Sequence, residues 1–228
     1  MTNLLNKLKL IWRDKSLRNK VLFVLAALVV FRLLAAIPIP GIDSLALNRF
    51  LLNNQFLGIL NIFSGGGLTN LSIIMLGVGP YITGSIIMQL LTIMIPSLKK
   101  MYSEEGEAGR KKFTQYSRML TIPLAAFQGF ALLSILESQG ILVDLTSFDR
   151  IVNLFILVAG SVLLMWIGEL VSEFGIGNGV SLIIFAGIVS ALPSQVSQLI
   201  FTFDPSQIPL YLAFLVVGLI VIAAIVLV

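Results

Sequence analysis

The chain has 228 residues, of which 57% are hydrophobic and only 11% are charged, and its formal net charge is +4 at pH 7. A water-soluble domain of this length lacks the interior to bury so many apolar side chains, so the composition excludes the soluble classes and indicates an all-α protein that crosses a membrane several times. The absence of cysteine and histidine excludes disulfides, thiolate or imidazole metal sites and histidine-based catalysis.

The N-terminal region, residues 1–20 (MTNLLNKLKLIWRDKSLRNK), is basic and is predicted to be amphipathic and to lie at the cytosolic membrane surface. No small-residue cleavage site follows the next apolar run, so we expect no removable signal peptide. That run, residues 21–37, is the first predicted span, and the sequence IPIPG at residues 37–41 ends it.

A short apolar run at residues 56–63 is followed by Ser-Gly-Gly-Gly. The run is too short to cross a membrane, so it predicts a re-entrant or interfacial segment. The glycines fit either an ordinary loop tip or a hinge on which a small element swings out of a cavity.

The later apolar runs predict further spans. The second covers residues 71–95 and ends at Pro96, and a charged cytosolic loop follows at residues 97–115. The third, fourth and fifth spans cover residues 116–136, 151–171 and 180–199. After an external loop at residues 201–209, the run at residues 210–228 reaches the last residue without a polar flank, and we interpret it as a truncated sixth span.

The basic residues predict the orientation. Six lie before the first span and six lie in or just after the loop at residues 97–115, out of 15 in the chain. Cytosolic loops are enriched in lysine and arginine, so both segments and the N-terminus are expected in the cytosol. The charged loop is either a solvated connection or a landing surface for a soluble protein.

The second predicted span contains GVGPYITGSIIMQLL at residues 77–91. Gly77, Gly79 and Pro80 predict a break in the helix, which membrane proteins tolerate only against protein or a water-filled cavity. Aliphatic residues recur at every fourth position along this stretch, at Val78, Ile82 and Ile86. Ser85 and Gln89 are also four residues apart and form an adjacent polar face. This pattern fits either ordinary helix packing or a surface that faces both a channel and another helix.

The sequence SEFGIGNGVSLIIF at residues 172–185 is rich in glycine but does not fit a nucleotide-binding loop, because position 180 is valine and no strand precedes it. It predicts a tight turn, with Asn178 or Ser181 capping the next helix. Ile184 and Ile188 then repeat the aliphatic spacing of the second span. Arg32 and Glu169 lie near span ends, where their charges can reach the membrane surface.

Four segments together resemble the SecY family, the central subunit of the Sec protein-conducting channel. They are IPIPG, NIFSGGGLTNLSIIMLGVGPYITGSIIMQLL, EEGEAGRKKFTQYSR and FGIGNGVSLIIFAGIVSALP. The resemblance covers the chain from Arg32 to Pro193. The resemblance implies an hourglass pore built from two inverted halves of five helices. Residues 1–200 correspond to the first half and residue 210 onward to the start of the second, so this chain alone is not expected to conduct protein.

The resemblance also implies roles for individual residues. Val78, Ile82, Ile184 and Ile188 correspond to the pore ring, an aliphatic gasket around the translocating chain. The plug, which blocks the outer funnel at rest, corresponds to residues 56–67 and includes Phe56, Leu57, Ile59, Leu60, Ile62, Phe63, Ser64, Gly65, Gly66 and Gly67. Ser85, Ile86, Gln89 and Gln128 correspond to the lateral gate, and Arg110, Lys111 and Lys112 to the contact with a cytosolic protein.

The implied partners are SecE-type and SecG-type small subunits, SecA or the ribosome, signal peptides, nascent chains and membrane lipid. Sequence-specific nucleic-acid binding, cofactors, metals and catalytic residues are not expected. The implied location is a bacterial cell membrane.

Two other functions are compatible with part of the sequence. A small-solute secondary transporter also uses broken helices, but it needs a coupling residue at the membrane midplane, which the spans do not supply. A half-length channel or insertase that pairs with itself in opposite orientation would need a weaker charge bias. An enzyme is disfavoured, because intramembrane serine chemistry lacks its histidine and no aspartate pair lies within the spans.

Overall fold

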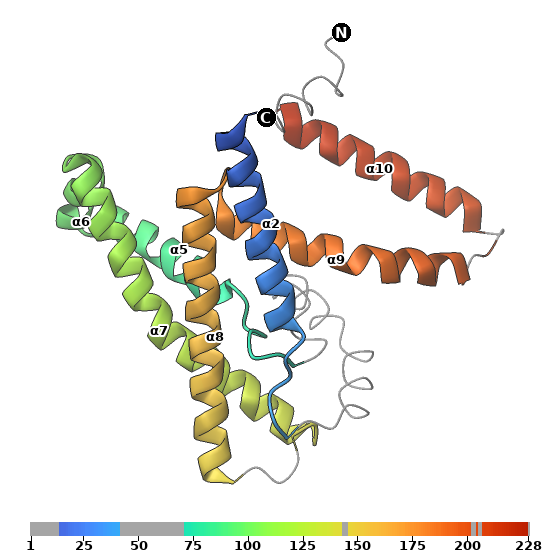
Figure 1. Cartoon of the computed structure of the whole chain (residues 1–228), viewed down its shortest axis with the longest axis horizontal. Coiled ribbons are helices and arrows are strands. Elements are labelled where there is room, and N and C mark those ends of the chain that lie inside the picture. Colours follow the sequence, from blue (N-terminus) through green and yellow to red (C-terminus); the bar gives the residue numbers. More distant parts are fainter. Residues whose placement is uncertain (1–13, 42–70, 143–145, 202–203, 205–206, 228) are drawn as a thin grey trace. The chain divides into compact units, whose positions relative to one another are not determined.

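The chain is described from a computed structural model, which describes residues 14–41, 71–142, 146–201, 204 and 207–227 (Figure 1). Residues 56–67, the predicted plug, lie outside the described residues, as do residues 1–13. Within the described part seven helices are present: α2 (Lys15–Ala35), α5 (Gly79–Met94), α6 (Pro96–Ser103), α7 (Gly106–Ser138), α8 (Ser147–Phe174), α9 (Gly179–Phe201) and α10 (Ile208–Leu227). The chain divides into two compact units, Met1–Ser190 and Ala191–Val228, and each is described by itself.

Three described helices are long and apolar enough to cross a membrane, namely α7, α8 and α10. The pair α5 and α6, bent by 110° at its break, is a fourth candidate. The apolar part of α9, Gly179–Pro193, is shorter than a usual span, and α2 carries four charged residues, Lys15, Arg18, Lys20 and Arg32. The sequence predicts five complete spans and part of a sixth, so spanning by α2 and by α9 stays a prediction.

The helix of the second predicted span begins at Gly79, whereas the sequence pattern predicts a start at residue 71. Residues 71–78 instead form turns, and Gly77 has a φ of +60°. The N–H of Ile39 donates to the carbonyl of Leu71 (2.9 Å) and the N–H of Ile73 donates to that of Ile37 (3.0 Å). The predicted glycine–proline break is thus confirmed, and Pro80 lies in the first turn of α5, where its missing N–H costs no helical hydrogen bond.

The charged connection predicted at residues 97–115 is mostly helical. It comprises most of α6 and the first turns of α7, with only Glu104 and Glu105 between the two helices. Met101 and Phe113 pack together with Met88 of α5, while the charged side chains remain exposed. The apolar contacts are few and widely spaced among the charges, so their helical period is hard to recognise in the sequence.

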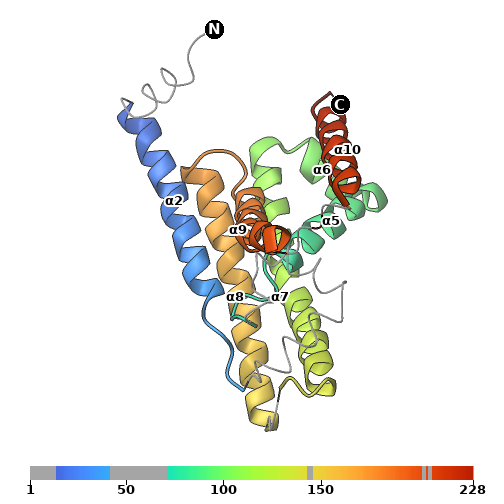
Figure 2. The same ribbon diagram turned by 90° about the vertical axis from the view of Figure 1, so that its right-hand side faces the viewer.

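Helix α8 contacts α2, α5 and α7 in the first unit. Its first turn is fixed by a capping box, in which the N–H of Asp149 donates to Thr146 Oγ1 (3.2 Å) and the N–H of Thr146 donates to Asp149 Oδ2 (3.1 Å). Helices α2 and α7 both pack against α8 (Figures 1 and 2). The predicted third and fourth spans, residues 116–136 and 151–171, fall within α7 and α8.

Two apolar clusters meet at α8. The first cluster surrounds Leu157 and includes Leu71, Met75, Leu133 and Leu136. The second cluster surrounds Leu164 and includes Phe31, Ala35, Ile74, Val78 and Ile183. The turns at residues 71–78 contribute to both clusters, so α8 fixes the backbone that leads into α5.

Candidate functional site

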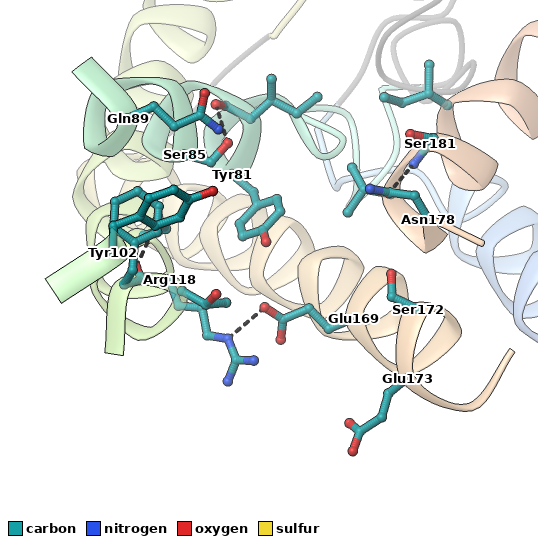
Figure 3. Close-up of a pocket in the computed structure, with 16 residues that line it drawn as sticks. Tyr81, Ser85, Gln89, Tyr102, Arg118, Glu169, Ser172, Glu173, Asn178 and Ser181 are labelled. Carbon is teal, nitrogen blue, oxygen red and sulfur yellow. Dashed lines mark hydrogen bonds and ion pairs between the residues drawn. The ribbon is translucent and has the colours of Figure 1, made fainter. Parts of the chain in front are cut away.

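A pocket of about 750 Å³ lies among α5, α6, α7, α8 and the start of α9 (Figure 3). Most of its lining residues are polar or charged, and a smaller group is apolar. The polar and charged residues are Tyr81, Ser85, Gln89, Tyr102, Thr114, Ser117, Arg118, Glu169, Ser172, Glu173, Asn178 and Ser181, and the apolar ones are Ile82, Phe113, Val180 and Ile184.

An ion pair joins α7 to α8 in this pocket. Arg118 Nε donates to Glu169 Oε1 at 2.6 Å, and the side chains are 44% and 19% exposed. Figure 3 shows the Tyr81 ring from α5 pointing toward this pair, while Glu173 points away from it. Because the glutamate is largely removed from water, the arginine compensates a charge that would otherwise be costly at this position.

The turn between α8 and α9 is held by two polar side chains of the pocket. Ser172 Oγ accepts a hydrogen bond from the N–H of Gly179 (2.8 Å) and donates to the carbonyl of Gly168 (2.9 Å). The N–H of Ser181 donates to Asn178 Oδ1 (3.1 Å), so the predicted cap at Asn178 is confirmed. These bonds fix the direction in which α9 leaves the turn.

The apolar part of the pocket contains residues that the resemblance assigns to the pore ring. Ile82 of α5 and Ile184 of α9 line the pocket and also pack against the buried cluster that contains Val78. Val78 itself is only 1% exposed, whereas Ile188 is 42% exposed and lies outside that cluster. The structure thus brings three of the four residues together, from two helices, and leaves Ile188 apart.

The four residues assigned to the lateral gate are divided. Ser85 and Gln89 line the pocket, and Ser85 Oγ donates to the carbonyl of Ile82 (3.0 Å). Ile86 is half exposed on α5, and Gln128 is partly buried on α7; neither lines the pocket. A polar strip on α5 therefore faces the pocket, and the aliphatic Ile86 does not belong to it.

The basic residues assigned to a cytosolic contact are exposed on α7. Arg110, Lys111 and Lys112 lie near the start of this helix and do not line the pocket. Lys112 Nζ lies 3.4 Å from a carboxylate oxygen of Glu105, in an exposed ion pair. The structure thus leaves all three basic side chains on the surface.

Sequence reasoning missed Tyr81, Arg118 and Ser172 as pocket residues, and it missed the pairing of Arg118 with Glu169. The paired residues are 51 positions apart, so no local spacing relates them. Both charges lie at the cytosolic ends of predicted spans, so the sequence places them at a similar depth in the membrane. That similar depth was the signal from which the pairing could have been inferred. Among the described residues, no group of three or more histidine, cysteine, aspartate or glutamate side chains is placed to hold a metal ion.

Breaking the ion pair is expected to destabilise the fold. We expect Arg118→Met to lower the free energy of unfolding in detergent by about 1–3 kcal/mol, because it leaves a largely buried carboxylate uncompensated; the exposure of the arginine places the value below that of a fully buried pair. Lys112→Met, in the exposed pair with Glu105, is the matched control and should cost less than about 1 kcal/mol. Equal losses in the two variants would contradict this assignment.

Comparisons with known proteins agree on one family. The SecY family model matches residues 72–228 of the chain. The chain is similar to protein translocase subunit SecY of Buchnera aphidicola subsp. Schizaphis graminum, with 44% identity over 187 residues, covering 79% of this chain and 42% of the relative. It is also similar to protein translocase subunit SecY of Escherichia coli K12, with 43% identity over 190 residues, covering 81% of this chain and 43% of the relative. The chain thus spans less than half the length of these curated relatives.

Two solved structures have a similar fold. One is Sec61 in the canine ribosome-channel complex from the endoplasmic reticulum, with 23% identity and a TM-score of 0.53. The other is the structure of a protein conducting channel, with 24% identity and a TM-score of 0.51. Each comparison covers 75% of this chain and 36% of the other chain. At these identities the likeness concerns the fold alone.

Proposed function

The chain belongs to the SecY family, and on this premise we propose that it forms one half of the wall of a protein-conducting membrane channel. The channel passes unfolded secretory polypeptides across the membrane and releases signal sequences and transmembrane segments sideways into lipid. In this proposal the chain guides another polypeptide without making or breaking covalent bonds.

The observation that carries the proposal is the composition of the pocket. Hydroxyl, amide and charged groups line most of it, and Ile82 and Ile184 supply aliphatic surface from two different helices. A polar wall stays hydrated and offers an unfolded chain no strong apolar binding surface, while a hydrophobic constriction excludes water and ions. Both properties are needed where a polypeptide slides past a seal.

In the proposed channel Val78, Ile82 and Ile184 contribute to the seal, together with Ile188 from the next turn of α9. The packing of the first three around one buried cluster supports this assignment. Ser85, Ile86, Gln89 and Gln128 form this half's side of the lateral gate, and residues 56–67 form the plug. For the gate, the support is that Ser85 and Gln89 lie on the pocket wall.

We further propose that the N-terminus is cytosolic in a bacterial cell membrane. The clustering of lysine and arginine at the start of α2 and along α6 and the start of α7 supports this orientation. The exposed residues Arg110, Lys111 and Lys112 would then meet a cytosolic motor or a ribosome. SecE-type and SecG-type subunits complete the proposed assembly.

Photo-cross-linking to an arrested polypeptide tests this function directly. A photoreactive residue replaces Ile82 or Ile184 in the full-length channel, and a secretory polypeptide is halted during transport. We expect strong cross-links from both positions, because both side chains line the pocket. Phe155, an exposed residue of α8 that does not line the pocket, is the control and should give little product. Equal yields at all three positions would contradict the proposal.

A further inference from the structure

Two glycines on the buried face of α8 allow other segments to approach its backbone closely. A methyl group added at Gly160 would lie 2.1 Å from the carbonyl oxygen of Ile73. A methyl group added at Gly168 would lie 2.9 Å from a methyl carbon of Val180 and 3.4 Å from its backbone nitrogen. Each glycine therefore forms a notch that receives another part of the chain.

A serine hydroxyl reinforces each notch. Ser161 Oγ, next to Gly160, donates to the carbonyl of Gly77 (3.2 Å) in a buried position. Ser172 Oγ, one turn after Gly168, accepts from the N–H of Gly179 (2.8 Å). At both notches α8 thus fixes a backbone segment by close contact and by a hydrogen bond. The bond of Ser161 is buried and that of Ser172 is partly buried, and the buried bond is the more costly to lose.

The two segments that enter the notches lead directly into the two helices of the proposed seal. The segment at Ile73–Gly77 precedes Val78 and Ile82 at the start of α5. The segment at Gly179–Val180 begins α9 and precedes Ile184. Val78, Ile82, Val180 and Ile184 all pack in the cluster around Leu164, which lies between the two glycines on α8.

We infer that α8 acts as a spacer that sets the separation of the two seal-bearing helices, with Gly160 and Gly168 as its positioning residues. The glycines are eight residues apart, so the notches are about 12 Å apart along a helix that rises 1.5 Å per residue. A helix is stiff over this length, and the distance between the start of α5 and the start of α9 is fixed accordingly. The relevance of this distance to the seal rests on the proposed function.

The geometry predicts a graded response to added volume. At Gly160 the obstructing atom belongs to the backbone, so Gly160→Ala must displace the Ile73 segment by about 1.3 Å before the contact reaches the 3.4 Å of an ordinary van der Waals distance. At Gly168 the nearest obstructing atom is a side-chain methyl carbon at 2.9 Å, so Gly168→Ala requires a smaller shift. Gly218→Ala in α10 is the matched control, because no atom lies within 4 Å of the added methyl group.

Distances between spin labels test this inference. The labels are attached to introduced cysteines, and this chain contains no cysteine that would also be labelled. In the full-length channel, one label pair is placed at the exposed residues Ile86 of α5 and Phe185 of α9. A second pair at Phe127 of α7 and Trp166 of α8 reports on the rest of the unit. We expect Gly160→Ala to shift the Ile86–Phe185 distance by about 1 Å, Gly168→Ala to shift it less, and Gly218→Ala to leave it unchanged. The Phe127–Trp166 distance should stay constant in all three variants.

A second variant applies if Gly160→Ala prevents assembly. Ser161→Ala removes only the hydroxyl group and should broaden the Ile86–Phe185 distance distribution, and Ser161→Thr, which keeps a hydroxyl group, should restore its width. An unchanged Ile86–Phe185 distribution in Gly160→Ala would overturn the inference. If Gly160→Ala does not assemble, an unchanged distribution in Ser161→Ala would do the same. An equal shift in both label pairs would also overturn it.

The distance measurement does not require transport, so its outcome is independent of the outcome of the cross-linking test. A shifted distance without cross-links at Ile82 and Ile184 would overturn the proposed seal. Cross-links with an unchanged distance would overturn only the positioning role of α8.

Discussion

Replacing Ile82 by asparagine is expected to raise the ion leak of the resting full-length channel about tenfold. An amide holds water in a constriction that aliphatic side chains keep dry, so it lowers the barrier to ion passage. A barrier lowered by about 1.4 kcal/mol corresponds to a tenfold higher rate. Ile82 is suited to this test because it lines the pocket and packs against the cluster of Val78. The measurement is ion flux through channels reconstituted in lipid vesicles, without a substrate polypeptide.

Two matched variants make this result specific to the seal. Ile82→Leu conserves volume and apolar character and should leave the leak at its original level. Leu90→Asn introduces the same amide two turns along α5, at an exposed residue outside the pocket and the proposed gate, and should change the leak much less. An unchanged leak in Ile82→Asn, or an equal leak in Leu90→Asn, would contradict the assignment of Ile82 to the seal.

Replacing Leu157 by alanine is expected to lower the free energy of unfolding by about 2–4 kcal/mol. Leu157 is fully buried and packs against the turns at Leu71 and Met75 as well as against Leu133 of α7. Between apolar helices in a membrane the loss comes chiefly from missing packing contacts and from the cavity left behind. Unfolding in mixed detergent micelles, titrated with a denaturing detergent, measures this difference.

Leu170→Ala is the control for this second prediction, since it makes the same chemical change on the same helix at a residue that is 45% exposed. It should cost less than about 1 kcal/mol, as surface substitutions usually do. If the two variants unfold at the same denaturant concentration, α8 does not organise the cluster around Leu157.

The features predicted correctly from the sequence depend on local chemistry. Gly77 and Pro80 mark the break before α5, and Asn178 marks the cap of α9, because each acts within a few residues of its own position. The apolar runs of α7 and α8 are long and give the predicted third and fourth spans. Such signals need no knowledge of the neighbouring helices.

The features that the sequence did not reveal depend on contacts between distant segments. Residues 71–78 are apolar enough for a helix, but hydrogen bonds to the chain around Ile37 and Ile39 hold them as turns. Arg118 and Glu169 become a pair only when α7 packs against α8. Ile188 shares its spacing with Ile184, yet the cluster forms only where the first turns of α9 meet α8. These are tertiary effects, and local patterns carry no record of them.

The hydrogen bonds that join Ile37 and Ile39 to Ile73 and Leu71 have a consequence for which substitutions this junction tolerates. Both bonds run between backbone groups, so almost any residue type at these four positions can make them. Proline is the exception at positions 39 and 73, because it lacks the N–H that each of these residues donates. The entry into α5 therefore depends on the backbone at this junction more than on the identity of its side chains.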